Sequence, residues 1–134
     1  MRMRMTALAS IVGLFFVATL ASAHHAFTAE FDVNQPVTLR GVVTKVQLIN
    51  PHTWIHIDVK DKDGKVTTWM IEGGTPNVLI RNGIRKDSLP IGSEVIVEGF
   101  RSKDGAPRAN GLDITFLDGR KILLGSSAPA PAKQ

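Results

Sequence analysis

The stretch that organises the sequence joins a turn signal to an alternating strand, and it reads Asn50-Pro51-His52-Thr53-Trp54-Ile55-His56-Ile57-Asp58. Successive side chains of a strand point to opposite faces of the sheet. One face of this strand is therefore aliphatic and carries Ile55, Ile57 and Val59. The other is aromatic and polar and carries Trp54, His56 and Asp58, with His52 added if the direction continues back through the turn. The pattern predicts a half-buried strand with a site on its polar face.

The residues on both sides of this stretch predict further strands and one helix. Alternating or β-rich runs, separated by Gly, Pro and Asp turns, predict strands at residues 37–49, 54–60, 66–72, 94–100, 109–116 and 122–124. Thr75 has the character of a helix N-cap, Pro76 that of a first helical residue and Gly83 that of a stop. A helix of about two turns is therefore expected between the third and fourth strands.

This order of elements predicts an all-β fold, namely a small OB-like barrel of five to six strands with one short helix between strands three and four. Gly41 lies inside the long first strand, where a glycine often marks the bend at a barrel corner. An open β-meander with an added helix is the alternative architecture.

The first 23 residues have the features of an export signal. Arg2 and Arg4 precede an apolar run at residues 7–20, and Ala21-Ser22-Ala23 matches the small-residue cleavage pattern. The run is shorter than the roughly 20 residues that span a bilayer. We therefore expect a Sec-type signal at 1–23, an arm at 24–36, the barrel at 37–124 and a disordered tail at 125–134, in a periplasmic or secreted protein without a membrane span.

The composition excludes several classes of function. Without Arg2 and Arg4, the 16 basic residues fall to 14 against 12 acidic ones, so the exported chain has a net charge of about +2. This charge is too small to favour nucleic acid as a partner. The chain contains no cysteine, so neither a disulfide nor a redox thiol is expected.

Four separated motifs carry a resemblance to a known family: His24-His25-Ala26-Phe27, Asn50-Pro51-His52-Thr53-Trp54, Trp69-Met70-Ile71-Glu72-Gly73-Gly74 and Asp118-Gly119-Arg120-Lys121. Together they resemble a family of small exported bacterial proteins of unknown function. The architecture is also similar to that of exported bacterial OB-fold proteins. The resemblance implies a periplasmic OB-like domain and implies no activity.

The histidines are the candidate metal ligands. After cleavage, His24 offers its amine and its imidazole to one metal ion, and His25 or His52 can add a further nitrogen. Nitrogen-rich sites of this kind suit Cu(II), so copper is the favoured metal. The alternative is that His24 and His25 form a solvated terminus and that His52 only stabilises its turn.

The polar strand face is the candidate ligand site. Trp54, His56 and Asp58 would share it with Met70 and Glu72 of the next strand, while Trp69 faces the other way. A tryptophan beside polar groups suits a flat ligand or a glycan, and the face also suits a partner protein. The alternative is that Trp54 packs on Phe27 or Phe31 and closes the barrel.

The sequence offers few groups of residues that could form a catalytic site. The aspartates lie in glycine turns and Glu72 has no paired carboxylate, so a hydrolase is not indicated and a non-enzymatic protein is favoured. A copper-dependent oxidoreductase is a third hypothesis, and it would require an open metal site.

Overall fold

The computed structural model describes residues 26–85 and 87–129, and the fold is all-β. Its strands are β1 (Phe31–Gln47), β2 (Trp54–Lys60), β3 (Val66–Glu72), β4 (Glu94–Ser102), β5 (Arg108–Phe116) and β6 (Lys121–Leu123). Two short helices accompany them, α2 (Pro76–Arg81) between β3 and β4 and a helical turn at residues 26–30. The predicted bounds of β2 and β3 are confirmed, as are the position of α2 and its Thr75 cap, whose hydroxyl accepts a hydrogen bond from the Val78 amide.

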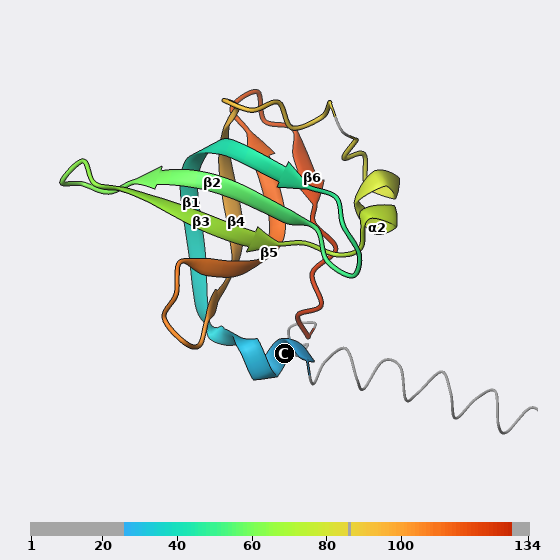
Figure 1. Ribbon diagram of the computed structural model, residues 1–134, viewed down its shortest axis with the longest axis horizontal. Coiled ribbons are helices and arrows are strands. Elements are labelled where there is room, and N and C mark those ends of the chain that lie inside the picture. The colour runs from blue at the N-terminus through green and yellow to red at the C-terminus, as the bar shows by residue number, and fades with distance from the viewer. Residues whose placement is uncertain (1–25, 86, 130–134) are drawn as a thin grey trace, which may run out of the picture.

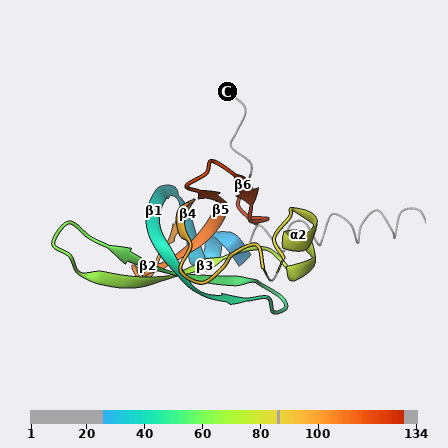
Figure 2. The ribbon, with the colours of Figure 1, turned by 90° about the horizontal axis from the view of Figure 1, so that it is seen from above.

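The strands form a closed ring of pairings (Figure 1). Hydrogen bonds connect them in the order β3-β2-β1-β4-β5-β6, and a further pairing joins β3 to β5. All neighbours are antiparallel except β3 and β5, which run parallel from Met70–Arg108 to Glu72–Asn110. The β2–β3 hairpin projects from the ring at the end away from α2 (Figures 1 and 2). An open meander would lack the β3–β5 pairing.

β1 is 17 residues long and serves two neighbours. Its first part pairs with β4 and its second part with β2, and Val42 is paired with both. Gly41 precedes Val42, and a Cβ on this glycine would lie 2.7 Å from the carbonyl oxygen of Asp58 on β2. The glycine therefore permits the close crossing of β1 and β2 where β1 changes partner. A register shift between Val43 and Lys45 bends the strand further.

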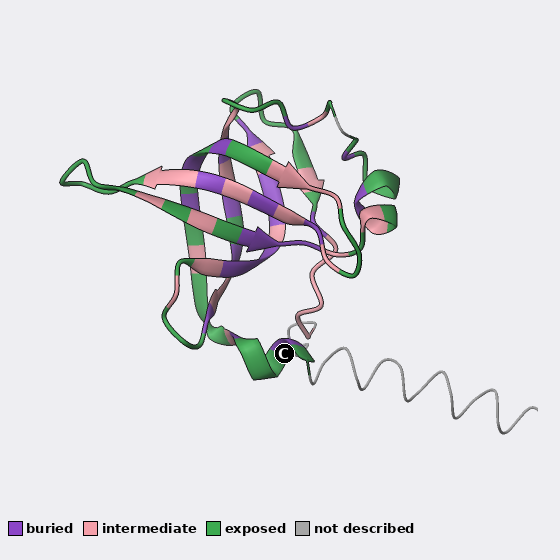
Figure 3. Cartoon of the chain, in the orientation of Figure 1, coloured by how far each residue is buried: buried purple, intermediate pink, exposed green. Residues whose placement is uncertain are grey.

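The interior of the ring is aliphatic, and the alternation of buried and exposed residues along the strands is visible in Figure 3. Fully buried side chains from six elements meet there: Val43, Ile55, Ile57, Ile71, Leu79, Val95, Val97 and Ile114. Leu79 brings the short α2 helix onto this core. The aliphatic face predicted for β2 is therefore the face that forms the core. In the described part of the chain, no helix has the length and apolar character needed to cross a membrane.

The first described residues pack on the outside of the ring. Phe27 is 2% exposed, and its ring lies 5.7 Å from that of Phe31 and 5.9 Å from that of Phe100, edge-on to the latter. The amide of Lys103 donates a hydrogen bond to the carbonyl of Glu30 at 2.9 Å. The sequence predicts an arm at residues 24–36, whereas β1 already begins at Phe31 and residues 26–30 dock against β4.

The residues after β6 also lie against the ring. Gly74 donates its amide to the Leu124 carbonyl at 2.7 Å, and the Ser126 hydroxyl donates to the side-chain oxygen of Asn110 on β5. Residues 125–129 are partly buried as a result, although the sequence favours disorder from Gly125 onward. The remaining residues of that predicted tail, 130–134, lie outside the described residues.

Candidate functional site

The loop between β1 and β2 holds His52 in a fixed place. Thr53 is fully buried, and the peptide bond from Asn50 to Pro51 is cis. The amide of Thr53 donates to the Gly74 carbonyl at 2.9 Å, and the amide of Gly73 donates to the Thr53 carbonyl at 2.8 Å. These two hydrogen bonds attach the backbone next to the histidine to the turn after β3. The other two predicted metal ligands, His24 and His25, lie outside the described residues.

His52 contacts Glu72, the last residue of β3. Its Nδ1 lies 3.2 Å from Oε1 of Glu72, and the two side chains are 45% and 9% exposed. The histidine is therefore at the surface and the carboxylate beneath it. A carboxylate that accepts the Nδ1 proton of a histidine fixes the tautomer and leaves Nε2 as a lone-pair donor.

Glu72 is a carboxyl group in an unfavourable place for a charge. Burial raises its pKa above the ordinary value, and the negative charge of Glu30 acts in the same direction. The charges of His52 and Arg108 and a hydrogen bond from the Asn110 side chain oppose this shift without cancelling it. The ionised form of Glu72 consequently lowers the stability of the fold near neutral pH.

Replacing Glu72 by glutamine is expected to change how stability depends on pH. Because the pKa of Glu72 is higher in the folded than in the unfolded chain, the folded chain gains stability as the pH falls through that range and loses it as the pH rises. Urea unfolding at pH 5 and pH 7 should show the wild type losing stability relative to Glu72→Gln at the higher pH. If the free energy of unfolding changes equally with pH in the two proteins, the ionisation of Glu72 does not destabilise the fold.

A small pocket of about 200 Å³ opens beside His52. It lies between the β1–β2 loop, the start of α2 and the segment after β6, and it is lined by Pro51, His52, Gly73, Gly74, Thr75, Val78, Gly125 and Ser127. The buried hydroxyl of the adjacent Thr53 has no hydrogen-bond partner. The pocket therefore gives the exposed edge of the His52 ring a concave surrounding.

The outer face of β2 has the composition that the sequence predicted. Trp54 pairs with Glu72, His56 with Met70 and Asp58 with Thr68, so each pair shares one side of the sheet. Trp69 pairs with Ile57 and packs against the core, on the opposite side as expected. This arrangement puts the predicted metal ligand His52 and the predicted ligand face in contact through Glu72.

His56 is held by a neighbour on β1. Its Nε2 lies 3.0 Å from the side-chain oxygen of Gln47. Partial burial lowers the pKa of His56, and the charge of Lys45 lowers it further, so both favour the neutral imidazole.

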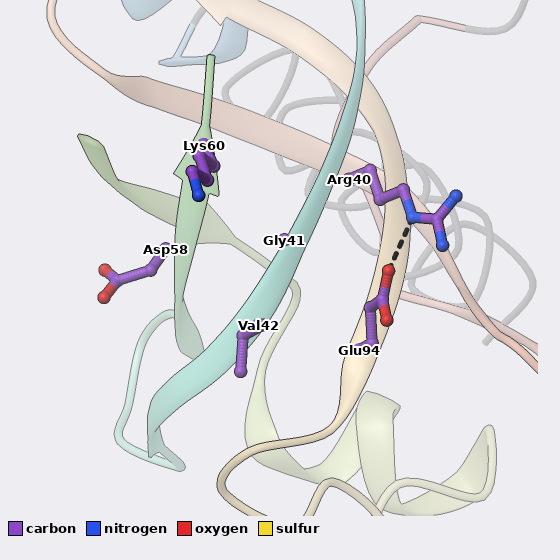
Figure 4. A pocket seen from close by; sticks show the side chains of 6 residues that line it. All are labelled: Arg40, Gly41, Val42, Asp58, Lys60 and Glu94. Carbon is purple, nitrogen blue, oxygen red and sulfur yellow. Dashed lines mark hydrogen bonds and ion pairs between the residues drawn. The ribbon is translucent and has the colours of Figure 1, made fainter. Parts of the chain in front are cut away.

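Asp58 belongs to a different part of this surface. Its carboxylate accepts a hydrogen bond of 2.6 Å from the Thr68 hydroxyl. It lines a shallow pocket of about 260 Å³ with Arg40, Gly41, Val42, Lys60 and Glu94. Figure 4 shows Arg40 and Glu94 joined to each other on the far side of Gly41 from Asp58. Charges of both signs line this pocket without converging on one point.

Three residues around Glu72 were not anticipated from the sequence: Glu30, Arg108 and Asn110. Arg108 lies 3.7 Å from the carboxylate of Glu30 and 5.8 Å above the ring of Phe31, and its Nε is buried without a hydrogen-bond partner. Asn110 is 1% exposed and pairs with Glu72 across the β3–β5 junction. No local sequence signal indicates this junction, because it joins strands that are not consecutive.

Among residues 26–85 and 87–129, no three histidine, aspartate or glutamate side chains gather closely enough to hold a metal ion. Searches of curated proteins and of solved structures found no significant match to this chain. A family model does match residues 12–113, which is more than half of the sequence. The chain therefore belongs to the family of unknown function DUF6152.

Proposed function

We propose that this chain is an exported, non-enzymatic OB-like domain that binds a transition metal, in particular Cu(II), through His24, His25 and His52. The free amine and imidazole of His24 would form a chelate, and an imidazole from His52 would complete a nitrogen-rich site of the kind that Cu(II) prefers. Metal binding of this type requires neutral imidazoles and a deprotonated amine, so affinity should rise with pH.

The observation that carries the proposal is the contact between His52 and Glu72. A metal-binding histidine usually donates its other ring N–H to a carboxylate or carbonyl, which orients the ring and makes it a better ligand. The 3.2 Å distance from Nδ1 to the buried carboxylate provides this arrangement and leaves Nε2 available. Burial raises the pKa of Glu72, so the fold holds this carboxyl group where its charge is disfavoured, as expected of a group retained for binding rather than for folding.

The docked residues 26–30 support the participation of the preceding histidines. Glu30 is close enough to Glu72 for its negative charge to raise the pKa of Glu72. Arg108 lies 3.7 Å from the carboxylate of Glu30, and its positive charge lowers the pKa of Glu72. The described chain therefore begins near the end of the ring where Glu72 and His52 lie. Donors from outside the described residues are needed, since His52 and Glu72 alone do not make a three-ligand site.

The strand order supports the OB-like fold in this proposal, and the features of the first 23 residues support export. The ring order β1-β2-β3-β5-β4, with a helix between β3 and β4, is the arrangement expected for an OB-like barrel. The features of residues 1–23 support Sec-type export to the periplasm or beyond.

Calorimetric titration of the processed protein, beginning at His24, with Cu(II) tests this function. We expect binding tighter than micromolar and a loss of affinity of at least about tenfold in His52→Gln, because one of three nitrogens is removed. Acetylation of the amino terminus should have a similar effect, whereas the control Val66→Ala, at an exposed position of β3, should bind Cu(II) as the wild type does. Binding weaker than micromolar, or an unchanged affinity in His52→Gln, would contradict the proposal.

A second candidate function is the binding of a small ligand, a glycan or a periplasmic partner protein on the outer face formed by Trp54, His56, Asp58 and Glu72. The register that pairs Trp54 with Glu72, and leaves both Trp54 and His56 partly exposed, favours it. Binding of this kind would persist in the presence of a metal chelator, which distinguishes it from the first function.

A further inference from the structure

We propose a second metal site, selective for Cu(I), that His56 and Met70 form on the outer face of β2 and β3. This site uses none of the residues assigned to Cu(II) above, so it goes beyond the proposed function and does not depend on it.

The strand register brings the two donors together. His56 and Met70 are direct cross-strand partners in the antiparallel pairing of β2 with β3. Side chains in such a pair have Cβ atoms about 5 Å apart, a separation that lets an imidazole and a thioether reach one ion. Their neighbours Ile55, Ile57 and Ile71 are completely buried in the core, so His56 and Met70 both point away from it.

Met70 is an unusual residue for this position. The sequence contains four methionines, and the other three, Met1, Met3 and Met5, precede the predicted cleavage site. Met70 would thus supply the sole sulfur atom of the exported chain, which has no cysteine. It is 37% exposed, and the core packing does not require it.

The hydrogen bond of His56 prepares its ring for a metal. Nε2 lies 3.0 Å from the carbonyl oxygen of the Gln47 side chain, and since that oxygen only accepts, this contact selects the tautomer with the proton on Nε2. Nδ1 then keeps its lone pair. In metal sites, a hydrogen bond from one ring nitrogen to a neighbouring side chain orients the histidine, and the other ring nitrogen binds the metal.

The donor set indicates the oxidation state. A thioether is a soft ligand that selects Cu(I) over harder divalent ions, and imidazole also binds copper. Trp54 lies on the same face two residues before His56, and the face of an indole ring attracts a nearby cation. The two carboxylates that flank this pair along the strands each have another partner, since Asp58 accepts a hydrogen bond from Thr68 and Glu72 contacts His52. Hard ions such as Mg²⁺ and Ca²⁺ prefer oxygen ligands, so a thioether and an imidazole do not favour them.

Lys45 is an unfavourable neighbour for a cation, since it pairs with His56 from the β1 side. Its side chain is exposed, and its ammonium group can remain in water on a flexible stem. A single positive charge on the bound ion keeps the repulsion small, which again favours Cu(I) over Cu(II).

Anaerobic competition between the processed protein and the chelator bicinchoninate for Cu(I) tests the site. We expect the protein to withdraw Cu(I) from the chelator, and Met70→Leu and His56→Gln each to weaken binding by at least about tenfold, because each removes one of the two donors. The control Val66→Ala, on the same strand at the hairpin tip, should bind as the wild type does. His52→Gln should also retain Cu(I) affinity, so failure of the Cu(II) site and failure of this site are distinguishable.

X-ray absorption of the Cu(I) form supplies an independent readout. A sulfur scatterer in the copper shell identifies Met70, because no other sulfur is present in a chain that begins at His24. The sulfur contribution should disappear in Met70→Leu. A wild-type spectrum without sulfur, or an unchanged Cu(I) affinity in Met70→Leu, would overturn the proposal.

Discussion

Replacing Gly99 by alanine is expected to lower the free energy of unfolding by about 3 kcal/mol or more. A Cβ on Gly99 would lie 2.3 Å from the carbonyl oxygen of Asn110 and 3.1 Å from the Cα of Gly111. These atoms belong to the backbone of β5, so no side-chain rotation can relieve the overlap. The register shift between Glu98 and Gly99 shows that β4 already bends at this point.

Urea unfolding measures the effect, and Gly105→Ala in the neighbouring hairpin is the matched control. Gly105 has a φ of +77°, and no atom lies within 4 Å of the place where a methyl group would stand. Alanine there costs only the conformational penalty of about 1 kcal/mol. Gly99 is not among the glycines with positive φ, so a loss in Gly99→Ala no larger than that in Gly105→Ala would show that the close approach of β5 does not determine the requirement for glycine at position 99.

Phe27→Ala is expected to release the amino-terminal residues from the ring. Truncating a buried phenylalanine costs about 3 kcal/mol, and here the loss falls on a segment that is held by the Phe31 and Phe100 rings. Amide hydrogen exchange at residues 26–31 should accelerate strongly, while the core strands keep most of their protection. Phe27→Leu should retain part of the docking because it preserves most of the apolar volume.

The same variant also bears on the Cu(II) proposal. If docking holds His24 and His25 near His52, releasing the segment lowers their effective concentration and should weaken Cu(II) binding by about tenfold or more. Val33→Ala, which truncates an exposed side chain a few residues later, is the control for both measurements. Unchanged exchange in Phe27→Ala would refute the docking, and faster exchange with unchanged Cu(II) affinity would refute only the link to the metal site.

Local sequence signals predicted the elements whose structure is determined locally. The alternation of Ile55 and Ile57 with polar residues was sufficient to place β2, and Thr75 followed by Pro76 was sufficient to place α2. The start of β1 was not predicted, because Asn34-Gln35-Pro36 has the composition of a turn. These residues lie in the strand at an irregularity, where the register with β4 shifts between Phe31 and Pro36.

The composition of the site was more predictable than its geometry. His52 and Glu72 were each identified as candidates, but for different sites, and their contact depends on backbone hydrogen bonds between Thr53 and the Gly73-Gly74 turn. Asn110 lies beside Glu72, and Arg108 near it, because β5 pairs with β3. A helix and another strand separate β3 from β5 in the sequence. Their register therefore follows from tertiary packing, and the periodicity within either strand does not predict it.

The double pairing of β1 has a thermodynamic consequence. Since this one strand joins β4 on one side and β2 on the other, the pairings that surround the core are linked into a single cooperative unit. An ion bound only by the native chain adds its binding free energy to that whole unit. A metal ion bound at His52 should therefore slow hydrogen exchange at the β4 amides that exchange only when the whole domain unfolds, although β4 contributes no ligand to the site.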